Sequence, residues 1–152
     1  MALGREPHLL VVVGSDSRGG AGIAREIETI ACLDVRTCLC CSALTVQTQE
    51  DALEIQVTQP GLVTDQMRAA LQANRVAGTK VGMLATAEII VAAVAAVLRE
   101  YRAHIDNPDP VLASTAGRAL LEASAIPHHE VASDAACRVD TGASCRLRAS
   151  GQ

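Results

Sequence analysis

Residues 9–22 read LLVVVGSDSRGGAG, and this stretch decides the fold. It begins with Leu9 to Val13, a continuous run of apolar residues that is typical of a strand buried within a parallel sheet. A loop of Gly, Ser and Asp residues follows, and Ile23 to Leu33 then carries apolar residues at the spacing of a helix. A strand, a glycine-rich loop and a helix in this order predict the first unit of an α/β domain.

The same alternation of strand and helix continues along the chain. We expect strands at 35–46, 53–57 and 77–83, and helices at 63–74, 87–101 and, more briefly, 119–125. This order favours a mainly parallel sheet that is flanked by helices and joined by right-handed crossovers. Pro108 and Pro110 make a central strand unfavourable in their segment. Residues 127–152 show no periodicity, so we expect them to form an irregular or disordered tail.

Composition limits the classes of function. The chain has 152 residues, which suits one domain or part of a larger one, and 49% of them are hydrophobic, which is enough for a buried core. That core must be aliphatic, because the chain has one Tyr and neither Phe nor Trp. The formal net charge of -4 and the lack of a basic stripe argue against binding to nucleic acid. No apolar run reaches the roughly 18 residues of a membrane span, so we expect no membrane partner.

The N-terminal segment and the cysteines point to the cytoplasm. The apolar run near the N-terminus is shorter than the core of a signal peptide, and it follows Glu6 and Pro7. In the cytoplasm the six cysteines stay reduced. Cys38, Cys40 and Cys41 have the wrong spacing for a zinc site, and within an apolar run we expect them to act as small hydrophobic residues.

The glycine-rich loop is the first candidate site. A loop between a strand and a helix N-terminus offers backbone N–H groups to anions and polar ligands. It is not a P-loop, because it has no Gly-Lys-Ser/Thr, and it is not a dinucleotide fingerprint, because Arg25 stands where the third Gly is needed. The alternative is a plain connection in which Gly permits close packing.

Residues at the ends of the later strands are further candidates, because open parallel sheets bind ligands beside the carboxyl ends of their strands. Gln47 follows the second strand, and its amide can donate to and accept from an aminopyrimidine edge; otherwise it is a solvated loop residue. At the end of the strand expected at 77–83, Gly82 permits close backbone approach and Met83 offers an apolar wall, unless Met83 belongs only to the core. Asp109 either holds Mg²⁺ or activates a hydroxyl, or it belongs to a plain proline turn.

Four segments together resemble the hydroxymethylpyrimidine/phosphomethylpyrimidine kinase family of thiamine biosynthesis, which belongs to the ribokinase-like superfamily. They are VVVGSDSRGGAGIARE (11–26), SALTVQT (42–48), TKVGML (79–84) and DPVLASTAGRALLE (109–122). The resemblance covers residues 8–122. It implies the α/β fold of that superfamily, a three-layer arrangement of a parallel sheet with flanking helices, of which the C-terminal half is missing here.

The resemblance also implies roles for individual residues. Those that would bind the pyrimidine are Gly14, Asp16, Glu26, Thr45, Gln47 and Met83. Gln47 is the characteristic contact, Thr45 would frame the ring with it, and Met83 would cover the ring face. Glu26 stands where the family usually has Asp, which keeps the charge but adds a methylene group. Asp109 would lie close to the region of phosphate transfer.

The implied reaction is phosphoryl transfer from ATP, with Mg²⁺, to the hydroxymethyl group of 4-amino-5-hydroxymethyl-2-methylpyrimidine and then to its monophosphate. Such transfer depends mostly on positioning and on stabilisation of charge. The implied partner is therefore a small pyrimidine, and a homodimer is possible.

This sequence also departs from the family. The PN-x-x-E segment and the GTGC motif, which carries the family's proposed catalytic Cys, have no clear counterpart, and Cys145 in DTGASC (140–145) is only a faint echo. We therefore expect residues 1–126 to be the N-terminal part of the kinase domain, left by truncation or a frameshift, and 127–152 to be unlike the family. The alternatives are a non-catalytic pyrimidine-binding module and an inactive fragment that exposes an uncovered sheet edge.

Overall fold

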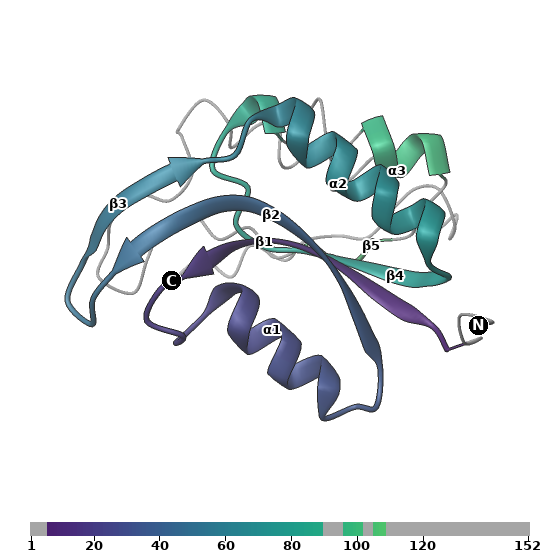
Figure 1. Cartoon of the computed structure of the whole chain (residues 1–152), viewed down its shortest axis with the longest axis horizontal. Coiled ribbons are helices and arrows are strands. Elements are labelled where there is room, and N and C mark those ends of the chain that lie inside the picture. The colour runs from purple at the N-terminus through teal and green to yellow at the C-terminus, as the bar shows by residue number, and fades with distance from the viewer. Residues whose placement is uncertain (1–5, 90–95, 102–104, 109–152) are drawn as a thin grey trace, which may run out of the picture.

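The computed structural model of the chain describes residues 6–89, 96–101 and 105–108. Within these residues one sheet runs in the order β3-β2-β1-β4-β5. Its strands are β1 (His8–Asp16), β2 (Arg36–Gln47), β3 (Ala52–Val57), β4 (Val76–Val81) and β5 (Ile105–Pro108). The helices are α1 (Gly22–Ala31), α2 (Pro60–Ala73) and α3 (Ala96–Tyr101). Helix α1 covers one face of the sheet, and α2 and α3 cover the other, which confirms the predicted three-layer α/β class (Figure 1).

Strand pairing is mainly parallel, as predicted. β1 lies in the middle and pairs in parallel with β2 and β4, while β4 pairs in parallel with β5. Only β3 among these strands is antiparallel: it folds back on β2 as a hairpin, with Thr45 opposite Ile55. The expected strands and helices up to β4 lie within three residues of their observed bounds.

The central strand explains why the sheet has helices on both faces. Leu10 and Val12 of β1 pack with Val63 and Met67 of α2, and all four side chains are fully buried. On the other face, Val11 and Val13 pack against Ile30 of α1. Burial on both faces is what the continuous apolar run of this strand predicts. The described core is mainly aliphatic, with Met and Cys side chains among its members and Tyr101 packed against it.

The segment with the two prolines contributes a strand in spite of them. β5 pairs with β4 and stands last in the described sheet, where Pro108 lies opposite Val81. Such a place is compatible with proline, which cannot donate a backbone hydrogen bond to a further neighbour. Residues 90–95 of the expected helix at 87–101, the expected helix at 119–125, the boundary at 126 and the tail at 127–152 lie outside the described residues. No helix in the described part is both long and apolar enough to cross a membrane.

Candidate ligand-binding site at the strand ends

Parallel pairing brings the ends of three strands to one edge of the sheet. β1 ends at Asp16 and β2 at Gln47, and Asp16 is the register partner of Thr45. Met83 follows the end of β4 and lies against β1, because a Cβ on Gly14 would stand 3.1 Å from the Met83 Sδ. The structure therefore brings together Gly14, Asp16, Thr45, Gln47 and Met83, which the sequence placed at separate strand ends.

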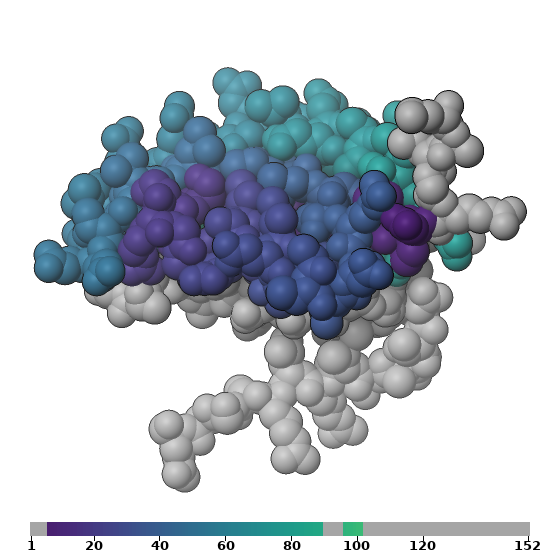
Figure 2. Space-filling view, turned by 60° about the horizontal axis from the view of Figure 1, so that its bottom comes forward, coloured from purple at the N-terminus to yellow at the C-terminus, as the bar shows by residue number. Residues whose placement is uncertain are grey.

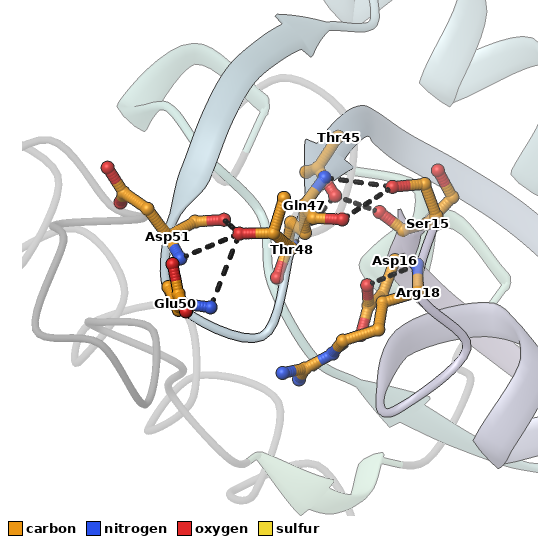
Figure 3. A network of polar contacts seen from close by, with 9 residues as sticks. Ser15, Asp16, Arg18, Thr45, Gln47, Thr48, Glu50 and Asp51 are labelled. Atoms are coloured by element: carbon orange, nitrogen blue, oxygen red, sulfur yellow. Dashed lines mark hydrogen bonds and ion pairs between the residues drawn. The ribbon is translucent and has the colours of Figure 1, made fainter.

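Short hydrogen bonds join the ends of β1 and β2 (Figure 3). Thr45 Oγ1 donates to the Ser15 carbonyl at 2.6 Å and accepts from Gln47 Nε2 at 2.7 Å. The backbone N–H of Gln47 donates to Ser17 Oγ at 2.8 Å. Gln47 is therefore held from both its backbone and its side chain, which orients its amide at the edge of the sheet.

The glycine-rich loop folds around a buried carboxylate. Asp16 Oδ1 accepts the backbone N–H of Arg18 at 2.9 Å, and the Asp16 carbonyl accepts from Gly19 at 3.0 Å. The Asp16 side chain is only 3% exposed, and its Oδ2 has no hydrogen-bond partner among the described residues. The Arg18 guanidinium is its nearest cation, at 3.7 Å. Because an unpaired buried carboxylate oxygen is costly, it is a natural acceptor for a donor group of a ligand.

Close backbone approach requires glycine at the start of α1. Gly22 has a φ of +61°, and a Cβ there would stand 2.4 Å from the Gly14 carbonyl oxygen. The loop thus returns onto β1, where Ser15 and Gly22 form an isolated bridge. This contact is a structural reason for one glycine of the loop, in addition to any contact with a ligand.

Met83 is fixed by a contact that the sequence did not reveal. Its carbonyl accepts a hydrogen bond from the fully buried Ser42 Oγ, and its side chain, which is 6% exposed, packs with Ala43, Ala85 and Ile55. Ser42 lies in the SALTVQT segment, but nothing in a Ser-Ala pair indicates that the hydroxyl turns inward. The sequence likewise gives no signal for Ser17, because a serine in a glycine-rich loop usually contacts water.

Glu26 lies on α1, one turn after Gly22, and its carboxylate accepts a hydrogen bond from Lys80 of β4. Its predicted contact with a pyrimidine stays a prediction, as do the predicted contacts of the other candidate residues. Asp109 and Cys145 lie outside the described residues.

Two buried cysteines of β2, Cys38 and Cys40, are poor nucleophiles. Burial raises the pKa of the Cys38 thiol, and burial together with the neighbouring Cys41 raises the pKa of Cys40 to about 12. At neutral pH both thiols keep their protons, and only a thiolate attacks or binds a metal. Among the described residues, no three His, Cys, Asp or Glu side chains are grouped so that they could hold a metal ion.

Comparison with known proteins gives a consistent result. The family described as "Phosphomethylpyrimidine kinase" matches residues 16–133, which is more than half of the chain. Over 121 residues the chain is 40% identical to the hydroxymethylpyrimidine/phosphomethylpyrimidine kinase of Mycobacterium tuberculosis (strain ATCC 25618 / H37Rv), covering 79% of this chain and 44% of that protein. Over 118 residues it is 38% identical to the thiamine biosynthesis bifunctional protein ThiED of Geobacter sulfurreducens, covering 78% of this chain and 24% of that protein.

A solved structure agrees with these sequence relatives. The phosphomethylpyrimidine kinase of Clostridium difficile 630 superposes with a TM-score of 0.70 at 25% identity, over 82% of this chain and 53% of that one. The chain spans less than half the length of the two curated relatives named above. These likenesses confirm the resemblance that the four sequence segments indicated.

Proposed function

The chain belongs to the phosphomethylpyrimidine kinase family, and from that premise we propose that it carries the pyrimidine-binding part of an ATP-dependent kinase. The substrate we propose is 4-amino-5-hydroxymethyl-2-methylpyrimidine, followed by its monophosphate. Members of the family are kinases, and two relatives are named for the same substrates. Phosphorylation of this pyrimidine would supply thiamine biosynthesis.

The observation that supports this proposal most is the shared edge formed by Gln47 and Met83. An aminopyrimidine ring has apolar faces and an edge that both donates and accepts hydrogen bonds. An oriented amide suits that edge, and a thioether suits a ring face. Gly14 allows Met83 to lie close against β1, since a Cβ there would stand 3.1 Å from the Met83 sulfur.

The remaining candidate residues complete the proposed site. Thr45 holds the Gln47 amide, so it would set the orientation of the ring. Asp16 Oδ2, which accepts no hydrogen bond from the residues that the structure describes, would accept one from a donor group of the substrate. Glu26 would stand behind the loop and contact the pyrimidine amine. Asp109 would lie towards the transferred phosphate.

ATP and Mg²⁺ belong to this proposal through the family. The described residues do not fit either group: they contain no P-loop sequence and no acidic cluster that could hold a metal ion. In this proposal the described residues therefore carry only the pyrimidine half of the reaction. Their part is to bind the ring and to orient its hydroxymethyl group, which is where much of the rate of phosphoryl transfer arises.

The proposal extends to partner, assembly and location. The partner is a small pyrimidine, the location is the cytoplasm, and the assembly is a homodimer. In support of an assembly, β3 stands last in the described sheet, and Leu53 and Val57 on it are exposed. An exposed sheet edge with apolar side chains favours pairing with another chain.

The test is a calorimetric melt of the full chain with and without hydroxymethylpyrimidine. A ligand that binds only the folded protein stabilises it by about 2.7 kcal/mol at a concentration of 100 times its Kd. We expect hydroxymethylpyrimidine to raise the melting temperature of the wild type and of Gln56→Leu, a control variant on exposed β3. It should leave the melting temperature of Gln47→Leu unchanged. A wild-type melt that does not move contradicts pyrimidine binding. ATP turnover by the same sample then separates a kinase from a non-catalytic binding module.

A further inference from the structure

One ion pair ties the helix behind the glycine-rich loop to the strand that leads to Met83. Lys80 on β4 is the only lysine of the chain, and its Nζ donates to Glu26 Oε1 on α1. The two side chains are 24% and 19% exposed. The other hydrogen-bonded ion pairs of the described residues are far more open; Arg68 and Glu100, for instance, are 43% and 48% exposed. Shielding from solvent makes the Lys80 pair less sensitive to screening.

The position of the pair connects both sides of the candidate site. Glu26 lies one turn after Gly22, where the loop enters α1. Lys80 lies three residues before Met83, between Val11 of β1 and Asn107 of β5. A shift of α1 relative to β4 would therefore move the loop relative to Met83, and this pair opposes such a shift.

Apart from the backbone bridge between Ser15 and Gly22, few polar contacts fix the beginning of α1. Its N-cap residue, Ala21, offers no side-chain hydrogen bond, and the first turn has no acidic residue. Ile23 and Ile30 pack on β1, but apolar contacts alone do not define an angle or a register. Among the described residues, the pair is the only side-chain hydrogen bond between α1 and the sheet.

We propose that Lys80 is a positioning residue for the pyrimidine site. By pairing with Glu26 it holds α1 and the glycine-rich loop at a fixed place relative to Met83, and so it sets the affinity for the substrate. This inference rests on the proposed function for its ligand, but the positioning of the loop does not depend on that ligand.

The experiment uses the full chain and three variants. Lys80→Met keeps an unbranched stem and removes the charge. Lys80→Arg restores the charge, and Arg68→Met is the matched control, because it breaks an ion pair between α2 and α3 on the opposite face of the sheet. The measurements are the Kd for hydroxymethylpyrimidine by titration calorimetry, the melting temperature, and hydrogen exchange of the amides at 17–24.

We expect Lys80→Met to weaken pyrimidine binding about tenfold, which lies between the effects of breaking an exposed and a buried ion pair. Exchange at 17–24 should become faster, while exchange in β3 should not. Lys80→Arg should bind within about threefold of the wild type, since it keeps the charge. Arg68→Met should lower the melting temperature slightly and leave the Kd unchanged.

Wild-type affinity in Lys80→Met overturns the inference, and so does an equal loss of affinity in Arg68→Met. If the wild type itself binds no pyrimidine, the proposed function fails, and amide exchange at 17–24 then tests the positioning role by itself. Unchanged exchange in Lys80→Met overturns that role, and faster exchange confined to these residues supports it. If Lys80→Met does not melt cooperatively, Lys80→Gln takes its place in the same comparisons, because it also removes the charge and leaves Glu26 unchanged.

Discussion

Gly22 shows how a single residue determines the shape of the candidate loop. Its φ of +61° is unfavourable for alanine, and an added Cβ would meet the backbone oxygen of Gly14, which cannot move without distorting β1. Gly19 has a similar φ of +75°, but a Cβ there would have no atom within 4 Å, so an alanine meets only backbone strain. Comparing the two positions therefore separates the close approach from the conformational cost.

We predict that Gly19→Ala lowers the free energy of unfolding by about 1–2 kcal/mol, the cost of a left-handed alanine. Gly22→Ala should cost clearly more, because the clash with Gly14 adds to that strain. Urea unfolding of both variants measures the difference. Equal losses would mean that the loop moves away from β1 without cost, and the contact would then have no structural role.

The buried thiol of Cys40 makes stability depend on alkaline pH. Its pKa in the folded chain is about 12, against an ordinary value of 9.0. Below pH 9 both the folded and the unfolded thiol keep the proton, and the stabilisation is fully present. Between about pH 9 and 12 the unfolded thiol loses its proton and the folded one does not, so the free energy of unfolding falls by about 1.4 kcal/mol per pH unit.

Urea unfolding at pH 8 and pH 10 tests this dependence. Cys40→Ala starts from a lower stability, because it removes buried volume, but it should lose less stability between the two pH values than the wild type does. Cys38 remains in both proteins and contributes a change of the same sign, since burial also raises its pKa. Parallel losses in the two proteins would show that Cys40 does not titrate as its burial requires.

At the scale of the element, an irregularity in β2 builds the site. Between Val13 and Ser15 the register of β1 against β2 shifts by one residue. The buried side chains of β2 accordingly change from Cys38, Cys40 and Ser42 to Ala43 and Thr45. Without this shift, Thr45 and Gln47, which lie two residues apart on the same face of β2, would both turn to the opposite face of the sheet.

A glutamine of α2 satisfies the backbone at this irregularity. Gln66 Oε1 accepts from the Cys41 N–H at 3.0 Å, and Gln66 Nε2 donates to the Cys41 carbonyl at 3.4 Å. We predict that Gln66→Leu lowers the free energy of unfolding by about 1–3 kcal/mol, because both backbone groups lose their partner. Gln72→Leu, an exposed change on the same helix, should stay within about 0.5 kcal/mol of the wild type. Chemical denaturation of both variants measures these changes. Equal losses in Gln66→Leu and Gln72→Leu would contradict the role of Gln66 in satisfying the backbone of β2.

The sequence predicted elements well and side-chain contacts poorly, for physical reasons. Strands are identified by the apolar runs at 9–13 and 77–83, because a strand buried on both faces is apolar along its length. The helix at 63–74 is identified by its spacing, because a helix buried along one stripe has apolar residues at regular intervals. The shift in β2 leaves no such pattern, since Ser42 and Ala43 are both small. The pairing of Glu26 with Lys80 joins residues 54 positions apart, and only the fold brings them together.

At the scale of the whole molecule, the candidate site lies at the end of the most deeply buried strand of the described sheet. β1 is paired on both sides, and Leu10, Val11 and Val12 are fully buried under helices on both faces. The residues that we propose to bind pyrimidine begin where this strand ends. Figure 2 brings the α1 side forward. There the purple and blue atoms of β1 and α1 form a continuous surface beside the hairpin of β2 and β3. A rigid centre with a site at its end keeps the binding residues in place.

This arrangement predicts the order in which backbone amides exchange with solvent. We expect the amides at 10–13 to exchange slowest, because they open only when the sheet unfolds, and those at 52–57 of β3 to exchange orders of magnitude faster. β3 pairs only with β2 in the described sheet, and Leu53 on it is 57% exposed. Native-state exchange followed by mass spectrometry gives both rates. Protection of β3 equal to that of β1 would contradict an open edge. Repeating the measurement after tenfold dilution would then show whether a second copy of the chain covers this edge. Protection that falls on dilution requires the homodimer, because only an intermolecular contact depends on concentration.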